Sequence, residues 1–230
     1  MITKKEILDA IHGKMIISCQ AVEGEPLYVE EKSIMYLMAR AAKQAGTPAI
    51  RTSSIRDVIA IKEETGLPVI GLVKIQYPGY EGYITPTMKE VDDLVAAGSD
   101  VVALRKRGDG TTVNEFIAQI KEKYPDIILM ADISNYEEGI NAWKCGVDIV
   151  GTTMSGYTDY TSKKDEPDYE LMERLAKDTD IPVIGEGKIH SPDQAVKALQ
   201  TGVWAIVVGG AITRPLEIAQ RFQKAIEAGK

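Results

Sequence analysis

Two glycine-rich stretches near the end of the chain carry residues suited to binding a phosphate group. The first is Gly185-Glu186-Gly187-Lys188, and the second runs from Gly209-Gly210 to Arg214 and Pro215. Glycines let backbone N–H groups approach an anion, a helix that begins at Pro215 adds a favourable field, and a guanidinium matches phosphate oxygens. A surface arginine at that helix start would instead oppose the helix dipole. We therefore expect a phosphate site formed by Gly187, Lys188, Gly209, Gly210 and Arg214.

Lys74 and Glu186 are the candidates for acid–base chemistry. Lys74 ends the apolar run Pro68–Val73, where burying an ammonium group is costly unless the group is used. Glu186 ends another apolar run, four strands further along a repeating pattern of strands and helices. Two such groups on opposite walls of a barrel suit epimerisation, in which a proton leaves one face of a carbon atom and another arrives at the opposite face. A salt bridge across the barrel, or a simple anion contact of Lys74, is the alternative.

Other polar residues close apolar runs in the same way. Gln20, Arg51 and Asp132 each stand at the end of such a run, as do Thr152 and Thr153. In a (β/α)8 barrel the C-terminal ends of the strands face the active site. We interpret Gln20, Arg51 and Asp132 as ligand contacts, although a strand-end residue can equally cap a helix or bind a loop carbonyl.

Short apolar runs alternate with segments of helical period along the whole chain. This pattern is typical of a parallel sheet buried on both faces, and eight units share the 230 residues, close to the ~30 residues of one βα unit. The sequence predicts one (β/α)8 barrel (TIM barrel) domain over residues 1–230, with a short amphipathic helix within 1–13. The expected strands are Met15–Cys19, Ala49–Arg51, Val69–Lys74, Asp100–Leu104, Ile127–Asp132, Val147–Thr152, Val183–Glu186 and Trp204–Val208. The expected helices are Glu31–Ala45, Ile55–Thr65, Thr87–Ala97, Val113–Lys123, Tyr136–Cys145, Tyr169–Lys177, Asp193–Thr201 and Pro215–Ala228.

Capping signals agree with these boundaries. Ser191-Pro192-Asp193-Gln194 and Ser134-Asn135-Tyr136-Glu137 have the form of capping boxes, and Thr85-Pro86 is expected to open a helix. Glycines follow five of the helical segments, where a left-handed residue commonly ends a helix. They are Gly46, Gly66, Gly98, Gly146 and Gly202.

Composition excludes several classes of function. The chain is 44% hydrophobic with a formal net charge of −7, which argues against broad nucleic-acid binding. No apolar run approaches the ~18 residues that cross a bilayer, and the start does not resemble a signal peptide, so we expect a cytoplasmic protein. Cys19 and Cys145 lie in apolar segments typical of reduced thiols. With only His12 and His190 besides, no cluster has the spacing of zinc ligands, and no metal is expected.

A series of motifs is similar in order and type to one known family. They are Ser18-Cys19-Gln20-Ala21, Ile50-Arg51, Val69-Ile70-Gly71-Leu72-Val73-Lys74, Tyr83-Ile84-Thr85-Pro86-Thr87, Met130-Ala131-Asp132-Ile133-Ser134, Gly151-Thr152-Thr153-Met154-Ser155-Gly156-Tyr157-Thr158, Gly185-Glu186-Gly187-Lys188-Ile189-His190 and Val208-Gly209-Gly210-Ala211-Ile212-Thr213-Arg214-Pro215. Over nearly the whole chain they resemble the bacterial N-acetylmannosamine-6-phosphate 2-epimerases. That family converts N-acetylmannosamine 6-phosphate into N-acetylglucosamine 6-phosphate during sialic acid breakdown.

The resemblance implies a (β/α)8 barrel without a redox cofactor. It implies that Lys74 and Glu186 are the acid–base pair, that Gln20, Arg51 and Asp132 contact the sugar, and that Gly187, Gly209, Gly210 and Arg214 bind the phosphate. It also implies a homodimer. The broad apolar arc of Pro215–Ala228 fits a dimer contact, although ordinary core packing explains the same arc.

The chain departs from the family after the fourth expected strand. The family usually reads Ala-Leu-Asp-Ala-Thr there, followed by a basic segment that ends in Asp-Gly. In this chain Ala103-Leu104 runs directly into Arg105-Lys106-Arg107-Gly108-Asp109-Gly110, so the aspartate is missing and Arg105 is not assigned to the site. Two other functions therefore stay open. One is a different phosphosugar isomerase, similar to the ribulose-phosphate epimerases but without their metal ligands. The other is a non-catalytic barrel that binds a phosphorylated metabolite and regulates a partner, such as an RNA-binding antiterminator.

Overall fold

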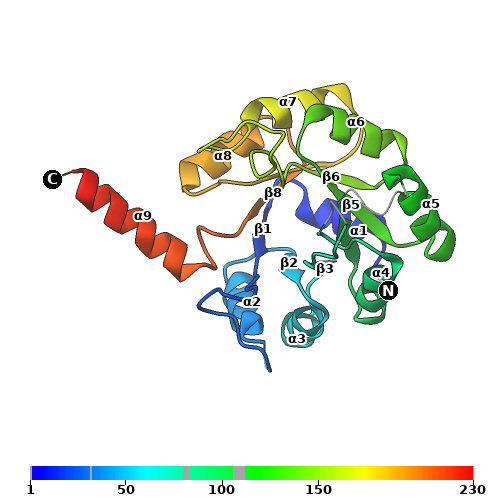
Figure 1. The fold of residues 1–230 in the computed structure, drawn as a ribbon, viewed down its shortest axis with the longest axis horizontal. Coiled ribbons are helices and arrows are strands. Elements are labelled where there is room, and N and C mark those ends of the chain that lie inside the picture. Colours follow the sequence, from blue (N-terminus) through cyan, green and yellow to red (C-terminus); the bar gives the residue numbers. More distant parts are fainter. Residues whose placement is uncertain (1, 32, 80–82, 106–111, 230) are drawn as a thin grey trace.

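The strands form a closed parallel barrel. In the computed structural model each strand is hydrogen-bonded to the next in chain order, and β8 closes the ring against β1 (Figure 1). The structure describes residues 2–31, 33–79, 83–105 and 112–229. The predicted (β/α)8 barrel is confirmed. The strands are β1 (Met15–Ser18), β2 (Ile50–Ser53), β3 (Val69–Leu72), β4 (Val101–Leu104), β5 (Ile128–Asp132), β6 (Ile149–Gly151), β7 (Val183–Glu186) and β8 (Ala205–Val208).

A helix follows each strand, and α1 (Lys4–Ile11) precedes the first strand. Three of the helices, α3, α5 and α9, begin and end at the predicted residues, whereas α2 begins four residues later than predicted, at Met35. The helices that follow the strands are α2 (Met35–Gln44), α3 (Ile55–Thr65), α4 (Met88–Ala96), α5 (Val113–Lys123), α6 (Tyr136–Lys144), α7 (Tyr169–Asp178), α8 (Pro192–Gln200) and α9 (Pro215–Ala228).

Apolar side chains pack on both faces of the strands, inside the barrel and between the barrel and the helices. On β1, for example, Ile16 belongs to the inner cluster and Ile17 to the outer one, because successive side chains point to opposite faces of a strand. Ile7 and Ile11 of α1 join the inner cluster, and the indole N–H of Trp204 donates to the carbonyl of Leu8 over 2.9 Å. Helix α1 therefore covers the N-terminal end of the barrel, and a ligand must enter at the opposite end.

The helix caps differ from the prediction at three places. Helix α6 is capped by Asn135, whose side chain accepts from the N–H of Glu138, and not by Ser134. Helix α4 is capped by Thr87 in a capping box with Glu90, whereas Thr85 lies earlier with a positive φ of 46°. Ser191 caps α8 as predicted, but Gln194 reaches back to the N–H of His190 rather than to that of Ser191. The glycines predicted to end helices, among them Gly66 at the end of α3, all have positive φ, as expected.

Strand β3 ends two residues before Lys74, earlier than predicted. Lys74 forms an isolated antiparallel bridge with Ile84, which comes from the segment leading to α4. The N–H of Ile75 donates to the carbonyl of Tyr83 over 2.9 Å, and the N–H of Thr85 to that of Val73 over 2.7 Å. Lys74 is thus held just beyond the end of the barrel by a short ladder of its own.

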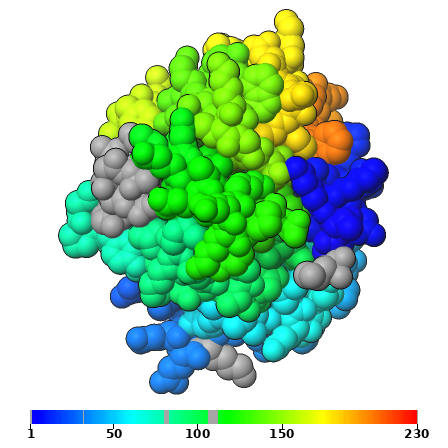
Figure 2. Space-filling model, turned by 90° about the vertical axis from the view of Figure 1, so that its right-hand side faces the viewer, coloured from blue at the N-terminus to red at the C-terminus, as the bar shows by residue number. Residues whose placement is uncertain are grey.

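The C-terminal helix α9 stands apart from the barrel. Figure 1 shows it pointing away from the ring of helices, with α8 on one side and α2 on the other. None of its residues is buried, and Phe222 is 69% exposed. Figure 2 shows the opposite side of the molecule, where side chains from α4 to α6 form a closed, rounded surface.

Candidate active site

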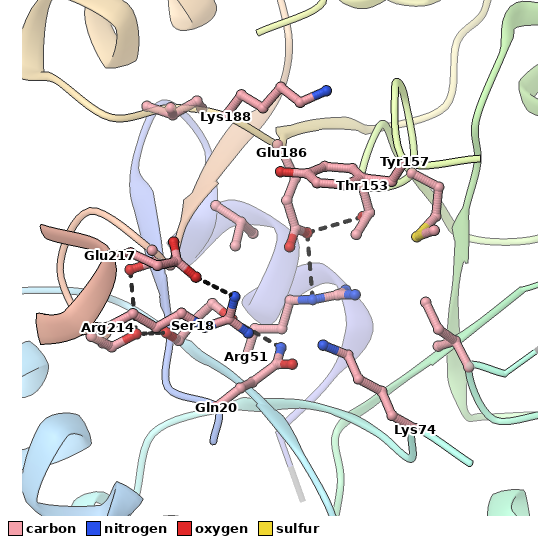
Figure 3. A pocket seen from close by; sticks show the side chains of 18 of the residues that line it. Ser18, Gln20, Arg51, Lys74, Thr153, Tyr157, Glu186, Lys188, Arg214 and Glu217 are labelled. Atoms are coloured by element: carbon pink, nitrogen blue, oxygen red, sulfur yellow. Dashed lines mark hydrogen bonds and ion pairs between the residues drawn. The ribbon is translucent and has the colours of Figure 1, made fainter. Parts of the chain in front are cut away.

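A pocket of about 220 Å3 opens at the C-terminal ends of the strands (Figure 3). The polar residues predicted at strand ends converge there from distant parts of the chain. Asp132 alone of the predicted site residues does not line the pocket. The predicted residues that line it are Gln20, Arg51, Lys74, Glu186, Gly187, Lys188, Gly209, Gly210 and Arg214.

Arg51 at the floor of the pocket joins two carboxylates from different walls. Its Nη2 donates to Asp132 Oδ2 over 2.7 Å, and its Nε lies 3.4 Å from Glu186 Oε2. The side chains of Arg51 and Asp132 are 1% and 0% exposed, so neither charge is solvated. Buried charges of this kind are tolerated only when they are paired. Asp132 therefore lies behind Arg51 as its counter-ion, one layer below the pocket surface.

Thr153 lies between the same two carboxylates. Its Oγ1 is 2.7 Å from Asp132 Oδ1 and 3.0 Å from Glu186 Oε2. A hydroxyl carries one hydrogen, so both contacts are hydrogen bonds only when one of the carboxyl groups is protonated. Burial raises the pKa of Glu186, Arg51 opposes this and the nearby Asp132 raises the pKa further. The arrangement therefore favours a proton on Glu186, donated to Thr153, which in turn donates to Asp132.

Lys74 faces the pocket from the wall opposite Glu186, because β3 and β7 are four strands apart in the ring. Within the described part of the chain its Nζ makes no hydrogen bond and no ion pair with a carboxylate; the cross-barrel salt bridge considered from the sequence is not formed. Burial lowers the pKa of Lys74, and the charges of Arg214 and Arg51 lower it further. Such a lysine is suited to lose its proton and act as a base.

Gln20 brings an amide to the same floor. Its Nε2 donates to Ser18 Oγ over 2.9 Å, whereas its buried Oε1 has no hydrogen-bond partner among the described residues. A buried acceptor without a partner is costly, so the oxygen is suited to accept from a bound ligand.

The glycine-rich segments form the other side of the pocket. Gly187 has φ +107°, a region that residues with a side chain rarely adopt. A Cβ at Gly210 would lie 2.2 Å from Glu217 Oε2, so the chain passes close beneath that carboxylate. Arg214 reaches the same place, where its Nη1 donates to Glu217 over 2.9 Å and its Nη2 lies 3.1 Å from Glu25.

Lys188 lines the pocket, but its ammonium group is turned toward the loop between β6 and α7. Nζ donates to the carbonyl of Gly156 over 3.2 Å and lies 4.4 Å from the ring centre of Tyr157. Tyr157 is 56% exposed and lines the pocket, so this loop supplies one of its walls. Lys188 thereby fixes the position of the loop.

Arg105 is buried beside the pocket rather than within its lining. It is 8% exposed, and its Nη2 donates to the hydroxyl groups of Ser134 over 3.2 Å and of Tyr160 over 3.0 Å. The rest of the shortened segment, residues 106–111, falls outside the described residues.

Several lining residues were not predicted. Ser18, Tyr83 and Thr213 lie within the motifs shared with the family but were given no role; Ser18 ends β1, and the other two lie outside the helices and strands, where periodicity gives no guide. Glu217 had a signal, since it lies three residues after Arg214 on one helix, a spacing at which opposite charges commonly pair. In the part of the chain that is described, no group of three or more His, Cys, Asp and Glu side chains is arranged to hold a metal ion.

The chain is similar to known proteins over nearly its whole length. A family model described as "Putative N-acetylmannosamine-6-phosphate epimerase" matches residues 35–228. The chain belongs to this family. A relative from Caldanaerobacter subterraneus subsp. tengcongensis, named "Putative N-acetylmannosamine-6-phosphate 2-epimerase", is 52% identical over 94% of this chain and 92% of its own. A relative of the same name from Clostridioides difficile is 49% identical over 96% of this chain and 99% of its own.

A solved structure of a family member has the same fold. The N-acetylmannosamine-6-phosphate 2-epimerase from Clostridium perfringens matches with a TM-score of 0.91 and 45% identity, over 98% of each chain. Among the described helices, none is both long and apolar enough to cross a membrane.

Replacing Arg51 by Met is expected to lower the free energy of unfolding by about 3–5 kcal/mol, because Asp132 would stay buried without its cation. The matched control is Arg40→Met, which breaks the exposed Arg40–Glu64 pair at 2.7 Å and should lower the free energy of unfolding far less, because solvent screens such a pair. Urea unfolding of both variants beside the unmodified protein measures the difference. Equal losses would show that the Arg51 pair does not hold this wall together.

Proposed function

We propose that the protein, acting as one domain over residues 1–230, converts N-acetylmannosamine 6-phosphate into N-acetylglucosamine 6-phosphate in amino sugar breakdown. One observation carries the proposal. A lysine that has no carboxylate partner in the described part of the chain and a glutamate suited to hold a proton face each other across the pocket of a family member. The reaction removes the proton at C2 and returns a proton to the opposite face.

The C2 hydrogen is acidic only when C1 is an open-chain aldehyde, because the resulting carbanion then delocalises into an enolate. Positioned acid–base groups contribute about 10²–10⁴-fold, and the remaining acceleration must come from stabilising the enolate charge. The Arg51 guanidinium lies in the pocket floor, and the pocket also holds the N–H donors of Gln20. These groups are placed to bind the sugar and the developing oxyanion.

The directions of the two pKa shifts support a different role for each member of the pair. Lys74, with its lowered pKa, takes the C2 proton as a neutral amine. Glu186, with its raised pKa, supplies a proton from the other wall and is reprotonated through Thr153 or from solvent. In the reverse direction the roles exchange, as microscopic reversibility requires.

The phosphate is the anchor of the substrate. We assign it to the glycines Gly187, Gly209 and Gly210 together with Arg214. Binding energy from a group that does not react can be used to position the group that does. Lys188 acts here through the β6–α7 loop rather than by touching the phosphate, because its Nζ is bound to loop carbonyls.

We also propose that two copies associate through α9. This helix has no buried residue and carries exposed Phe222, Ile226 and Leu216. Leu37 on α2 and Val196 on α8, the two helices beside it, are exposed as well. Burying a large apolar side chain contributes about 1.5–3 kcal/mol, so covering this helix with a second copy removes a large unfavourable surface.

The Glu186→Gln variant tests the assignment of the acid. In D2O we expect it to exchange the C2 hydrogen of N-acetylmannosamine 6-phosphate for deuterium while producing N-acetylglucosamine 6-phosphate about 10²–10⁴-fold more slowly, since Lys74 can still remove the proton. Proton NMR follows both signals in one sample, and Lys74→Met, which should lose exchange and turnover together, is the control. Epimerisation by Glu186→Gln at near the normal rate would show that Glu186 is not the acid.

The activity should rise with pH through an ionisation below 10.5, the ordinary lysine pKa, because only the neutral form of Lys74 accepts a proton. Arg214→Met removes a positive charge that lowers this pKa, so the rising limb of kcat/KM should move to higher pH. Arg221→Met, on the same helix, is the control and should leave the limb in place. A limb that does not move in Arg214→Met would argue against Lys74 as the titrating base.

Phe222→Asp should prevent the dimer from forming, because it places a charge in the apolar contact. The mass in solution should then fall from about twice 25.2 kDa to the 25.2 kDa of one chain. Gln220→Asp adds the same charge to the opposite face of α9 and should leave the dimer intact. Light scattering coupled to gel filtration distinguishes the two results. A monomeric unmodified protein would overturn the association proposal.

A further inference from the structure

Glu217 places a carboxylate in the part of the pocket that the proposed function assigns to phosphate. Its Oε1 accepts from Arg214 Nη1 over 2.9 Å, and it lines the same pocket as Lys74 and Glu186. In Figure 3 the Glu217 carboxylate and the Arg214 guanidinium lie together at one side of the pocket. The Glu217 carboxylate is thus already bound to Arg214, the residue expected to bind the phosphate of the ligand.

The same carboxylate also lies against the glycine segment. The Glu217 Oε2 atom would be 2.2 Å from a Cβ at Gly210, and its Cδ would be 3.3 Å away. The Glu217 carboxylate therefore fills the space that a side chain at position 210 would need. The two features expected to bind phosphate oxygens, a bare glycine backbone and a guanidinium, thus lie next to one carboxyl group.

A phosphate ester and the Glu217 carboxylate cannot share this place. A phosphate monoester carries about −1.5 to −2 charges near neutral pH, and like charges in contact repel. Arg214 is the cation that both would need. Glu217 is 39% exposed, lies in the first turn of α9 and has Arg221 Nη1 3.9 Å from its Oε2, so a carboxylate displaced from Arg214 has both solvent and a second cation within reach.

The second carboxylate on Arg214 is placed differently. Glu25 does not line this pocket; it contacts Arg214 Nη2 at 3.1 Å, and its Oε2 accepts from the backbone N–H of Val22 over 3.0 Å. Glu25 therefore holds Arg214 from outside the pocket. Arg214 has one carboxylate partner that can stay when phosphate binds and one that must leave.

We propose that Glu217 is a specificity-determining residue: its carboxylate competes with the ligand's phosphate for Arg214 and Gly210 and is displaced when the phosphate binds. This inference rests on the proposed phosphate site. It follows that every phosphorylated ligand binds with an affinity reduced by the free energy of that displacement. A sugar without a phosphate does not displace Glu217 and is unaffected.

The test is the affinity of Glu217→Gln for inorganic phosphate, N-acetylglucosamine 6-phosphate and unphosphorylated N-acetylglucosamine, measured by calorimetry. We expect the dissociation constants of the two phosphates to fall about 1.5- to 5-fold, the range for loss of one partly exposed ion pair, and that of the neutral sugar to stay the same. Glu227→Gln removes the same charge from the far end of α9 and should change none of the three. Glu25→Gln should weaken phosphate binding or leave it unchanged.

Three results would contradict the proposal. Weaker phosphate binding by Glu217→Gln would mean that Glu217 orients Arg214 for the ligand, and an equal gain for the neutral sugar would mean a general change of the pocket. A gain of the same size in Glu227→Gln would mean that net charge alone is responsible. Failure of the unmodified protein to bind N-acetylglucosamine 6-phosphate would instead overturn the proposed function. Glu217→Asp, whose shorter side chain keeps the charge but not the reach, provides the same comparison if the Gln variant unfolds.

Discussion

The buried charge of Arg51 is the constraint on which the rest of the site depends. A guanidinium that is 1% exposed must be neutralised, and Asp132 of β5 does this, while the carboxyl group of Glu186 on β7 lies 3.4 Å from the guanidinium Nε. One side chain from β2 thereby ties together two distant strands at the mouth of the barrel. Both carboxyl groups interact with Arg51 and Thr153, and neither forms a salt bridge with Lys74. Among the described residues the lysine has no carboxylate partner, and its burial lowers its pKa and favours the neutral amine.

The barrel and most of the site could be predicted from the sequence because both follow from one periodic rule. Buried parallel strands must be apolar, so a polar residue that ends such a strand is conspicuous, and in this fold all strands end at the same face. That is why Lys74, Glu186, Arg51 and Gln20 were found. The pattern of an apolar strand that ends in a polar residue shows where that residue lies in the barrel, but not which group its side chain contacts. It could not tell that Asp132 lies behind Arg51, or that Lys188 turns to the β6–α7 loop.

The errors at helix starts and loops have a similar cause. Serine, asparagine and threonine all cap helices well, so Ser134-Asn135 offered two caps one residue apart, and Thr85 and Thr87 offered two more. Local chemistry is nearly equal for each choice, and the surrounding packing decides. The apolar arc of α9 showed in the same way that the helix must be covered, but a pattern along one chain does not show whether its own barrel or another surface covers it.

Helix α9 connects two regions of the molecule that are otherwise separate. Its first turn carries Arg214 and Glu217, and Arg221 in the second turn donates to the carbonyl of Gly210 over 2.8 Å. Its remaining turns project from the barrel with their apolar side chains exposed. The helix therefore has its first turn at the rim of the pocket and its later turns on the surface of the molecule. Thermodynamic linkage is reciprocal. If binding of another molecule to the exposed turns tilts α9 and so changes the affinity of the pocket for an anion, then a bound anion changes the affinity of those turns for that molecule by the same free energy.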